Sequence, residues 1–423
     1  MKGIICNRKI KVGVVGAFRG DSFAGTAAHT GMELVAVCDS FEYRLKMVSD
    51  KYGVAGYQSF DEFLKHGMDA VVIATPFHLH APFAVKAMES GLHVLSETSC
   101  NITLAEGVEL YRKAQETQMC YMLAENYCYT RFNQEMKRLY DADEIGEVRY
   151  AEGEYNHPME PRSSLVYTVG YNHWRNQLPS CYYNTHALAP MMYITGTMPV
   201  AVSCVTIPRA GQTKGKNHFV MLVRMDNGAV FRIIGGGIPG HSNYYRFHGS
   251  SGAMENTRGP GYFGPETVRV WHEPWSLKEG QKDDVTYLPE WPSHGRDAEA
   301  TGHGGGDFFV EHHFAEAIRT GVQPFLDARR GITMTNVGIL AWFSANHDGA
   351  FLPIPDIASE EGQAQMLGNR LSPVKGVANA ELMPPEMRVQ TPFSPERAAL
   401  AREVWKELGY TEVEVEELLK VDD

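Results

Sequence analysis

The first third of the chain alternates short apolar runs with stretches of helical spacing. The runs of strand length are Lys9–Val15, Leu34–Cys38, Ala70–Ala74, His93–Ser96 and Cys120–Ala124. Strands that are apolar on both faces and are joined by helices form a parallel sheet with helices on each side. The pattern therefore predicts a doubly wound, Rossmann-type α/β domain, which we place at residues 1–128.

The turn after the first run reads Gly16-Ala17-Phe18-Arg19-Gly20. A dinucleotide fingerprint of the form GxGxxG has a middle glycine, whereas this turn lacks it and is one residue short. Amide groups at the start of the next helix would bind a pyrophosphate. We predict that these residues bind a dinucleotide, and the alternative is a fold that has lost its ligand.

Asp39 ends the second apolar run, at the distance from the turn, about 20 residues, that dinucleotide-binding domains use. An acid at this place accepts the ribose hydroxyls of NAD and repels the 2′-phosphate of NADP. Arg44 is a partner for such a phosphate, so NADP remains an alternative. The prediction is NAD, with Asp39 at its ribose.

The second part of the chain has the alternating period of an antiparallel sheet with one covered face. The alternating segments are Val148–Tyr155, Ala201–Ile207, Phe219–Met225, Ala229–Ile234, Tyr244–Phe247 and Val268–Trp271. Helical stretches at Thr185–Ile194 and Asp307–Thr320 interrupt them. We expect an α+β substrate and oligomerisation domain with an open, mostly antiparallel sheet at 129–357. A C-terminal tail at 358–423 carries a helix at Pro395–Leu408.

Charge and cysteine usage narrow the class of protein. Lys and Arg number 39 against 51 Asp and Glu, a formal charge of −12, which disfavours nucleic acid and anionic membranes as partners. No apolar run has transmembrane length, and the start lacks the apolar segment of a signal peptide. The seven cysteines include no CxxC pair. We expect reduced thiols and a cytoplasmic protein without a zinc site.

Several segments in order resemble the glucose–fructose oxidoreductase (Gfo/Idh/MocA) family. Besides the glycine turn, they are Ile73-Ala-Thr-Pro76 with His80, and Gly91-Leu-His-Val-Leu-Ser-Glu97. The likeness spans most of Lys9–Ile357. Dehydrogenases of that family continue Glu-Lys-Pro, and the lysine relays the proton of the substrate hydroxyl. Here Thr98 follows the glutamate, and it cannot carry that charge.

The family's downstream Asp-x-Gly-x-His motif is also changed, because Tyr182 replaces the aspartate and only His186 remains. Both losses resemble the branch that cleaves glycosides with bound NAD, glycoside hydrolase family 109. The matching segments are Glu125–Tyr129, Glu152–His157, Trp174-Arg175, Tyr183–His186 with Pro190, and Gly302–Asp307. This chain departs from the branch at Asn184, where the branch has proline, and in its short glycine turn.

The resemblance implies a carbohydrate substrate, an α-linked sugar such as an N-acetylgalactosaminide, and a homo-oligomer that is a dimer or tetramer. It implies oxidation of the C3 hydroxyl, loss of the C2 proton, elimination at C1, addition of water and reduction of C3. One alternative function is an NAD-dependent sugar or polyol dehydrogenase. Another is a non-catalytic NAD-binding regulatory protein.

Histidine and tyrosine suit the proton transfers of that reaction. We predict His186 as the base, with Tyr183 one helical turn away to orient the sugar or share a proton. Tyr155 and His157 lie two apart on a strand and so point to one face, where we expect them to join the site. The alternative for all four is ordinary core packing.

The remaining predicted cofactor contacts follow the carboxyl ends of the parallel strands, where ligands of such sheets bind. They are Thr75, Pro76, His80, Glu97, Thr98 and Asn126. Trp174 and Arg175 are expected to reach over the cofactor. Asp307 is expected to cap the helix that it begins. The histidine pairs His78/His80 and His312/His313 lack completing ligands, so no metal site is predicted.

Overall fold

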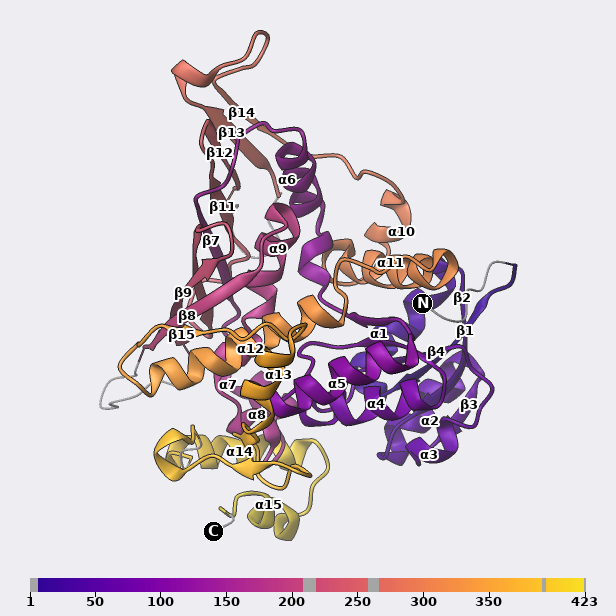
Figure 1. Cartoon of the computed structure of the whole chain (residues 1–423). Helices are drawn as coiled ribbons and strands as arrows, with labels where there is room; N and C mark the ends of the chain where they lie inside the picture. The colour runs from indigo at the N-terminus through magenta and orange to yellow at the C-terminus, as the bar shows by residue number, and fades with distance from the viewer. Residues whose placement is uncertain (1–6, 208–217, 258–265, 390–392, 422–423) are drawn as a thin grey trace.

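The computed structural model describes residues 7–207, 218–257, 266–389 and 393–421, which form two large sheets and the helices around them (Figure 1). The first sheet is six-stranded, with the order β3-β2-β1-β4-β5-β6 and parallel pairing throughout. Its strands are β1 Ile10–Val15, β2 Met32–Cys38, β3 Ala55–Tyr57, β4 Ala70–Ile73, β5 His93–Ser96 and β6 Tyr121–Leu123. The predicted Rossmann-type sheet is confirmed, and the short, half-exposed β3 is the strand that the apolar runs did not indicate.

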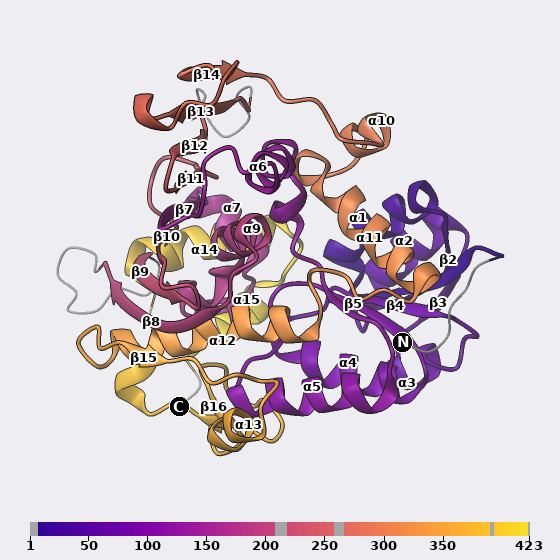
Figure 2. The ribbon, with the colours of Figure 1, turned by 45° about the horizontal axis from the view of Figure 1, so that its top comes forward.

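Helices cover both faces of this sheet. Those nearest to it are α1 Ala17–Thr26, α2 Glu42–Tyr52, α3 Phe60–Phe63, α4 His80–Glu89, α5 Leu104–Thr117 and α11 Gly306–Thr320. Figure 2 shows α1 and α11 on one side and α4 and α5 on the other. Because α11 comes after the second sheet in the sequence, the chain returns to the first domain to complete its covering layer.

The second sheet has nine strands in the order β14-β13-β12-β11-β7-β10-β9-β8-β15. The strands are β7 Tyr150–Asn156, β8 Pro199–Thr206, β9 His218–Met225, β10 Val230–Gly236, β11 Tyr245–His248, β12 Gly252–Asn256, β13 Val268–His272, β14 Asp284–Tyr287 and β15 Leu352–Pro353. Only β7 and β10 pair in parallel among the described strands of this sheet, so the expected mostly antiparallel sheet is confirmed.

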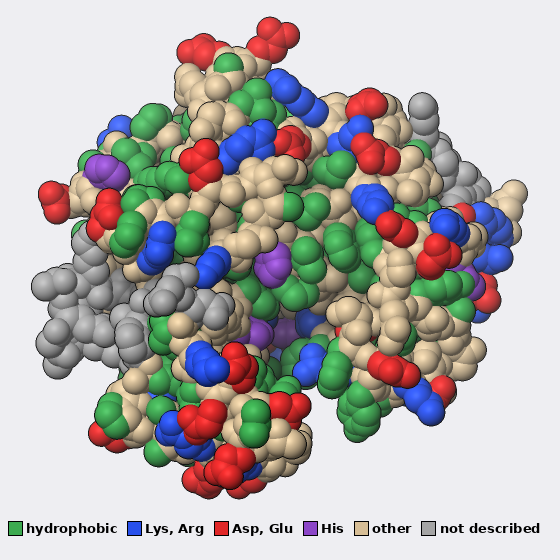
Figure 3. Space-filling model, turned by 90° about the horizontal axis from the view of Figure 1, so that it is seen from below, with side chains coloured by type: hydrophobic (Ala, Val, Ile, Leu, Met, Phe, Trp, Pro, Cys, Tyr) green, Lys and Arg blue, Asp and Glu red, His purple; other side chains and the backbone are tan. Residues whose placement is uncertain are grey.

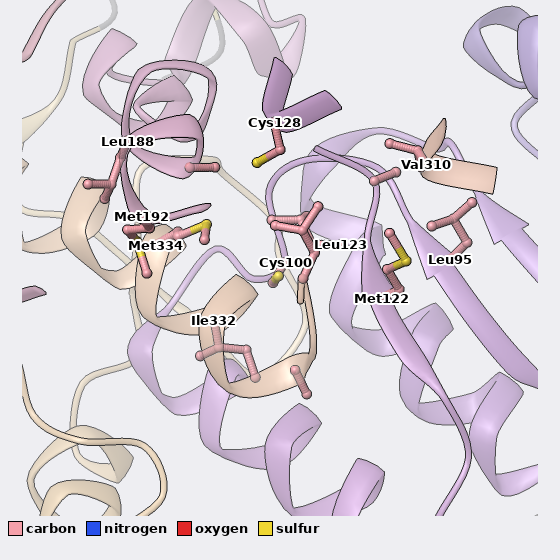
Figure 4. Close-up of a cluster of buried hydrophobic side chains, with 14 of the residues drawn as sticks. Leu95, Cys100, Met122, Leu123, Cys128, Leu188, Met192, Val310, Ile332 and Met334 are labelled. Carbon is pink, nitrogen blue, oxygen red and sulfur yellow. The ribbon is translucent and has the colours of Figure 1, made fainter. Parts of the chain in front are cut away.

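Helices of the second half cover one face of this sheet and join it to the first domain. They are α6 Arg131–Asp141, α8 Trp174–Gln177, α9 Thr185–Thr195, α10 Gly295–Glu299 and α12 Ala328–Ala345. Figure 4 shows buried side chains of β5, β6, α9 and α12 packed together, among them Leu95, Leu123, Leu188 and Ile332. The two sheets therefore share one hydrophobic core, which holds the carboxyl ends of the parallel strands against α9.

The tail folds back on the same chain. Helix α13 Glu360–Leu367 packs on α5, followed by the short strands β16 Leu371–Ser372 and β17 Glu381–Leu382. Helices α14 Pro395–Glu407 and α15 Glu412–Leu418 pack against α7 Pro161–Tyr167. The predicted tail helix is thus present in α14.

The structure also bears on the cysteines and on membrane-spanning helices. The described cysteines are free and buried, and Cys6 lies outside the described residues. Within the described ranges, no helix combines the length and apolar character that a membrane span needs.

Candidate active site

A hollow separates the two halves of the molecule on the face where the parallel strands end. Figure 3 shows histidine side chains (purple) and Lys or Arg side chains (blue) at its floor, between the larger and smaller lobes of this view. The residues that follow β1, β2, β4, β5 and β6 approach this region from one side, and α9 and β7 approach it from the other.

The glycine turn is short because α1 begins directly after Gly16. This glycine has φ +92°, and a Cβ atom on it would lie 2.4 Å from the carbonyl oxygen of Ala74. A Cβ atom on Gly20 would likewise lie 2.4 Å from Cγ1 of Val14. Both positions need glycine so that the helix start can approach β1 and β4 closely. The turn therefore keeps the close packing of a dinucleotide-binding fold without the middle glycine.

Asp39 is fixed at the end of β2 by backbone groups. Its Oδ2 accepts a hydrogen bond from the Ala17 amide at 2.7 Å, and its Oδ1 accepts one from the Phe41 amide at 2.8 Å. The guanidinium of Arg44 lies 4.7 Å from the ring centre of Phe18 and 5.7 Å from that of Phe41. Asp39 thus faces the glycine turn. Arg44, the residue that would favour NADP, stacks on two aromatic rings instead.

Arg19 joins two carboxylates at the centre of the cleft. Its Nε donates to Glu97 Oε1 at 2.6 Å, and its Nη1 and Nη2 donate to the two oxygens of Asp307 at 3.0 and 2.8 Å. The side chain of Arg19 is 25% exposed and that of Asp307 is fully buried. The predicted cofactor residue Arg19 therefore holds α1, the end of β5 and α11 together.

Asp307 is not the helix cap that we expected. The N-cap position of α11 belongs to Gly305, and Asp307 lies in the first turn. It also accepts hydrogen bonds from Ser22 Oγ and Asn126 Nδ2, both at 2.9 Å. Burial would raise the pKa of Asp307, but His303 and Arg19 outweigh that effect and hold its pKa well below the ordinary range. Asp307 is therefore an ionised carboxylate that several side chains hydrogen-bond beneath the cleft.

His80 is buried beside two backbone carbonyls. Its Nδ1 lies 2.8 Å from the Ser99 carbonyl oxygen and its Nε2 lies 2.9 Å from the Thr75 carbonyl oxygen. Both ring nitrogens therefore lie against backbone carbonyls of the loops after β4 and β5. Burial lowers the pKa of His80, so the ring is neutral and its single N–H donates to one of these carbonyls at a time. His80 connects the loops on which Pro76 and Thr98 lie, and its contact with the cofactor stays a prediction.

Thr98, which directly follows Glu97 after β5, is buried. Its Oγ1 lies 2.6 Å from Oγ1 of Thr185, at the start of α9. A pair of neutral hydroxyl groups thus lies where the loop after β5 meets the start of α9.

His186 lies in the first turn of α9 and pairs with a buried acid. Its Nδ1 is 2.8 Å from Oε1 of Glu125, whose side chain is fully buried. The hydroxyl of Tyr245 donates to the backbone carbonyl of His186. A carboxylate at Nδ1 fixes the ring so that Nε2 is the nitrogen available for proton transfer.

Aromatic rings surround His186. The ring centre of Tyr155 lies 4.4 Å from that of His186, and Tyr127 lies 4.8 Å from it. His157 stacks on Tyr155 at 5.9 Å. Burial, and next the neighbouring His241, lower the pKa of His157, which favours a neutral ring. The structure thus brings the predicted residues Tyr155 and His157 to the side of His186.

Tyr183 lies on the other side of His186, with ring centres 6.3 Å apart. Arg175 Nη1 donates to its hydroxyl oxygen at 2.7 Å. Burial raises the pKa of Tyr183 although the charge of Arg175 opposes it, so the phenol stays protonated. Trp174 stacks on Phe77, after β4, at 6.2 Å. The segment with Trp174 and Arg175 therefore reaches across to the loop after β4, and its contact with the cofactor stays a prediction.

Two residues central to this geometry were not predicted as site residues, Glu125 and Asp307. Glu125 directly follows the last parallel strand, next to the predicted Asn126, and its position at a strand end was the available signal. For Asp307, the signal was the glycine run before it. A Cβ atom on Gly306 would lie 2.5 Å from the carbonyl oxygen of Asn126, so this run permits close contact with the cleft.

The cleft fits a bound dinucleotide. The turn at Gly16 leaves no room for a Cβ atom, and Asp39 faces it. Oδ1 of Asn126 is buried and has no hydrogen-bond partner among the described residues, so it remains open to a donor such as a carboxamide. Within the described ranges, no cluster of three His, Cys, Asp or Glu side chains could hold a metal ion.

Family comparisons agree with this architecture. Residues 10–125 match the oxidoreductase family with an NAD-binding Rossmann fold, GFO/IDH/MocA. Residues 133–255 match the GFO/IDH/MocA C-terminal domain, and residues 240–362 match the glycosyl hydrolase 109 C-terminal domain. The matched families thus cover the two sheets in chain order.

Individual relatives are similar at low identity. A glycosyl hydrolase family 109 protein of Streptomyces filamentosus is 26% identical over 407 residues, covering 85% of this chain and 80% of that protein. One of Solibacter usitatus is 25% identical, covering 85% and 90%. A levoglucosan dehydrogenase in complex with NADH and levoglucosan has a TM-score of 0.69 at 20% identity, covering 82% and 100%. An oxidoreductase of Agrobacterium radiobacter in complex with NAD+, L-tartaric acid and magnesium has a TM-score of 0.67 at 17% identity, covering 82% and 98%.

Proposed function

The chain belongs to the Gfo/Idh/MocA oxidoreductase family, and we propose that it is an NAD-dependent glycoside hydrolase. In this proposal a sugar is oxidised transiently at C3, loses the group at C1 by elimination, takes up water and is reduced again. NAD, when bound, supplies the reversible two-electron oxidation at C3. The relatives named as glycosyl hydrolase family 109 proteins and the match of residues 240–362 support this assignment.

Residues of the first domain would hold the cofactor. The amide groups of Phe18 and Arg19 would bind the pyrophosphate, because they lie in the first turn of α1, whereas the Ala17 amide donates to Asp39 and the Gly20 amide to Gly16. Asp39 would accept hydrogen bonds from the ribose hydroxyls, and Oδ1 of Asn126 would accept one from the carboxamide of the nicotinamide. These assignments use the groups that face the cleft in this structure.

His186 is the proposed base that removes the C2 proton. The pairing of its Nδ1 with Glu125 carries the proposal, because the carboxylate stabilises the imidazolium that forms when Nε2 takes a proton. Tyr155 beside the ring and the protonated phenol of Tyr183 would hydrogen-bond the sugar and orient it. His157 is placed to contact the same sugar through its stack on Tyr155.

Thr98 supports elimination over simple alcohol oxidation. The family's dehydrogenases use a lysine at this position as their acid and base, whereas the buried Thr98 hydroxyl pairs with Thr185. A neutral hydroxyl cannot replace an ammonium group in that role. The pair of Glu125 with His186 is then the proposed group for proton transfer at C2.

The test measures aglycone and NADH together. The purified protein is incubated with nitrophenyl glycosides, including an α-N-acetylgalactosaminide, and with free sugars. We expect nitrophenol release without accumulation of NADH, and solvent deuterium at C2 of the product. Stoichiometric NADH from free sugars would identify a dehydrogenase instead. Bound NAD with neither signal would identify a binding protein.

A further inference from the structure

Phe18 and Tyr167 form an aromatic pair across the cleft. Phe18 lies in the first turn of α1, after the glycine turn, and Tyr167 is the last residue of α7, in the second half of the chain. Their ring centres lie 5.7 Å apart at an interplanar angle of 68°, an edge-to-face arrangement that aromatic rings favour. The two residues are 57% and 46% exposed, so the pair lies at the surface. It bridges the cleft beside the amides that we assign to the pyrophosphate.

The segment that carries Tyr167 continues along the carboxyl ends of the parallel strands. This strap, residues 161–177, runs from α7 to α8. Tyr167 contacts α1 directly after β1, and Trp174 stacks on Phe77, after β4, with ring centres 6.2 Å apart. Ligands of a parallel sheet bind beyond this edge. A dinucleotide in the cleft would therefore lie between the sheet and the strap.

Phe18 also has partners in the first domain. The guanidinium of Arg44, on α2, lies 4.7 Å from the centre of the Phe18 ring and 5.7 Å from that of Phe41. A cation near an aromatic ring is attracted by the charge distribution of that ring. The Phe18 ring thus contacts both Arg44 in the first domain and Tyr167 on the strap.

The C-terminal helices hold the strap in place. Nε1 of Trp405, in α14, donates to the carbonyl oxygen of Leu165 at 3.0 Å, and the amide of Tyr171 donates to the carbonyl oxygen of Leu418, in α15, at 2.7 Å. These contacts lie on either side of Tyr167 in the sequence. Figure 1 shows α14 and α15 at one end of the molecule, near α7. Their hydrophobic cluster is separate from the main core, so the position of Tyr167 depends on the tail.

We propose that Phe18 and Tyr167 form a gate over the dinucleotide site and that α14 and α15 keep this gate closed. The match to the glycosyl hydrolase 109 C-terminal domain ends at residue 362, so both helices lie beyond it. A redox-neutral reaction regenerates NAD in place and has no need to exchange it at each turnover. The gate makes that exchange slow. This goes beyond the proposed function, because NAD can be followed whether or not a glycoside is cleaved.

The gate opposes the entry of NAD as much as its release. Both rings belong to the chain, so the pair must separate for the dinucleotide to pass in either direction. Weakening the pair therefore raises the rates of association and dissociation alike and leaves their ratio, the dissociation constant, nearly unchanged. A direct contact between Tyr167 and bound NAD has a different signature, because its loss raises only the dissociation rate.

The experiment measures the release of NADH. The protein is exchanged into NADH by prolonged dialysis, an excess of NAD+ is added in a stopped-flow instrument, and the loss of NADH fluorescence gives the dissociation rate. Titration with NADH gives the dissociation constant. For Tyr167→Ala we expect release about 10-fold faster, with a dissociation constant within about threefold of the wild type, because an aromatic pair contributes up to such a factor to the barrier.

Tyr167→Phe and Val166→Ala are the matched variants. Phenylalanine keeps the ring that contacts Phe18, so Tyr167→Phe should release NADH at the wild-type rate. Val166 precedes Tyr167 in the same helix and is 43% exposed, and its replacement should also leave the rate unchanged. Phe18→Ala should match Tyr167→Ala, and the double variant should be no faster than either, because both remove one contact. Thermal unfolding of these variants should match the wild type.

Trp405→Ala tests the role of the tail. Release of NADH should accelerate as it does in Tyr167→Ala, because the strap loses its support in α14. Adding Tyr167→Ala should then have no further effect, since the gate is already open. Wild-type release from a Trp405→Ala protein whose α14 is open to trypsin would overturn the role of the C-terminal helices.

Three results would overturn the gate itself. They are unchanged release from Tyr167→Ala, a dissociation constant that rises as much as the release rate, and additive effects of Phe18→Ala and Tyr167→Ala. Each leaves the glycosidase proposal standing, because the cleavage of nitrophenyl glycosides tests that proposal separately. A protein that binds no NADH would overturn both proposals.

Discussion

Arg19 and Asp307 are 288 residues apart in the sequence and form an ion pair with two hydrogen bonds, of 3.0 and 2.8 Å. The pair ties the first helix of the Rossmann-type domain to α11, which follows the second sheet. Because Arg19 also donates to Glu97, a single cation neutralises two carboxylates at the floor of the cleft. The junction of α1, the end of β5 and α11 therefore depends on this one side chain.

Replacing Arg19 by methionine should destabilise the fold strongly. The change leaves Glu97 and the fully buried Asp307 without their cation, which costs about 3–5 kcal/mol for a buried pair. The free energy of unfolding in urea measures this loss. Arg8→Met is the control, because Arg8 pairs with Asp69 at the surface and should have little effect. Equal effects of the two variants would contradict the central role of Arg19.

Glu125→Gln should lower turnover about 10²–10⁴-fold while bound NAD stays unchanged. The amide keeps the shape of the side chain but cannot stabilise an imidazolium at His186 by charge. Steady-state kinetics and the NAD content of the purified variant measure both effects. Glu116→Gln, on the exposed surface of α5, is the control. A variant with wild-type turnover would remove the pair from the reaction.

Asp39→Ala should weaken NAD binding roughly 10- to 100-fold, because hydrogen bonds to a charged group contribute about 1.5–3 kcal/mol each. The affinity for NADP should increase relative to that for NAD, because the carboxylate that repels the 2′-phosphate is removed. Fluorescence titration with NADH and NADPH measures the two dissociation constants. An unchanged ratio of the two would contradict the role of Asp39 at the ribose.

Glu311 should make stability fall as the pH rises. Both its oxygens are buried, and burial together with the charge of Asp307 raises its pKa well above the ordinary value, although Arg19 and the Thr30 hydroxyl oppose this. The folded protein therefore keeps a proton that the unfolded chain releases above pH about 4.3. The free energy of unfolding therefore decreases as the pH rises above that value, by up to about 1.4 kcal/mol per pH unit, until the pKa of Glu311 in the folded protein is reached.

Glu311→Gln should remove this dependence. Urea unfolding between pH 5 and pH 8 compares the variant with the wild type, and the variant should gain relative stability toward pH 8. Glu316→Gln on the same helix is the control, because Glu316 is exposed and pairs with Arg319. Parallel pH curves for Glu311→Gln and the wild type would show that Glu311 is charged in the folded protein.

Trp405→Ala should release the tail without unfolding the rest. Trp405 is fully buried, and its Nε1 donates to the Leu165 carbonyl oxygen at 3.0 Å, within a cluster separate from the main core. Such a truncation costs about 3–5 kcal/mol. Trypsin should then cleave α14 faster, and KM should rise more than kcat falls, because α7 leads to the segment with Arg175. Trp275→Ala, at a side chain that is 81% exposed, should change neither measurement.

The sequence determined the two sheets and the edge at which the site lies. Strand and helix periodicity is local, so the apolar runs predicted β1, β2, β4, β5 and β6, and the strand ends indicated Asp39 and Asn126. The spacing of Tyr155 and His157 placed both on one strand face, and the structure puts them beside His186. The domain boundaries and the roles of the site residues stay predictions.

The tertiary structure alone decided which charged groups meet. Asp307 has a short-range pattern that suits a helix cap, and its contact with Arg19 exists only because α11 returns to the first sheet. His80 likewise has a motif position typical of a ligand contact, and only the fold shows that its two nitrogens lie against backbone carbonyls from two loops. Hydrogen bonds and ion pairs act over a few ångströms in space, so residues far apart in the chain become partners only when the packed core sets their distance.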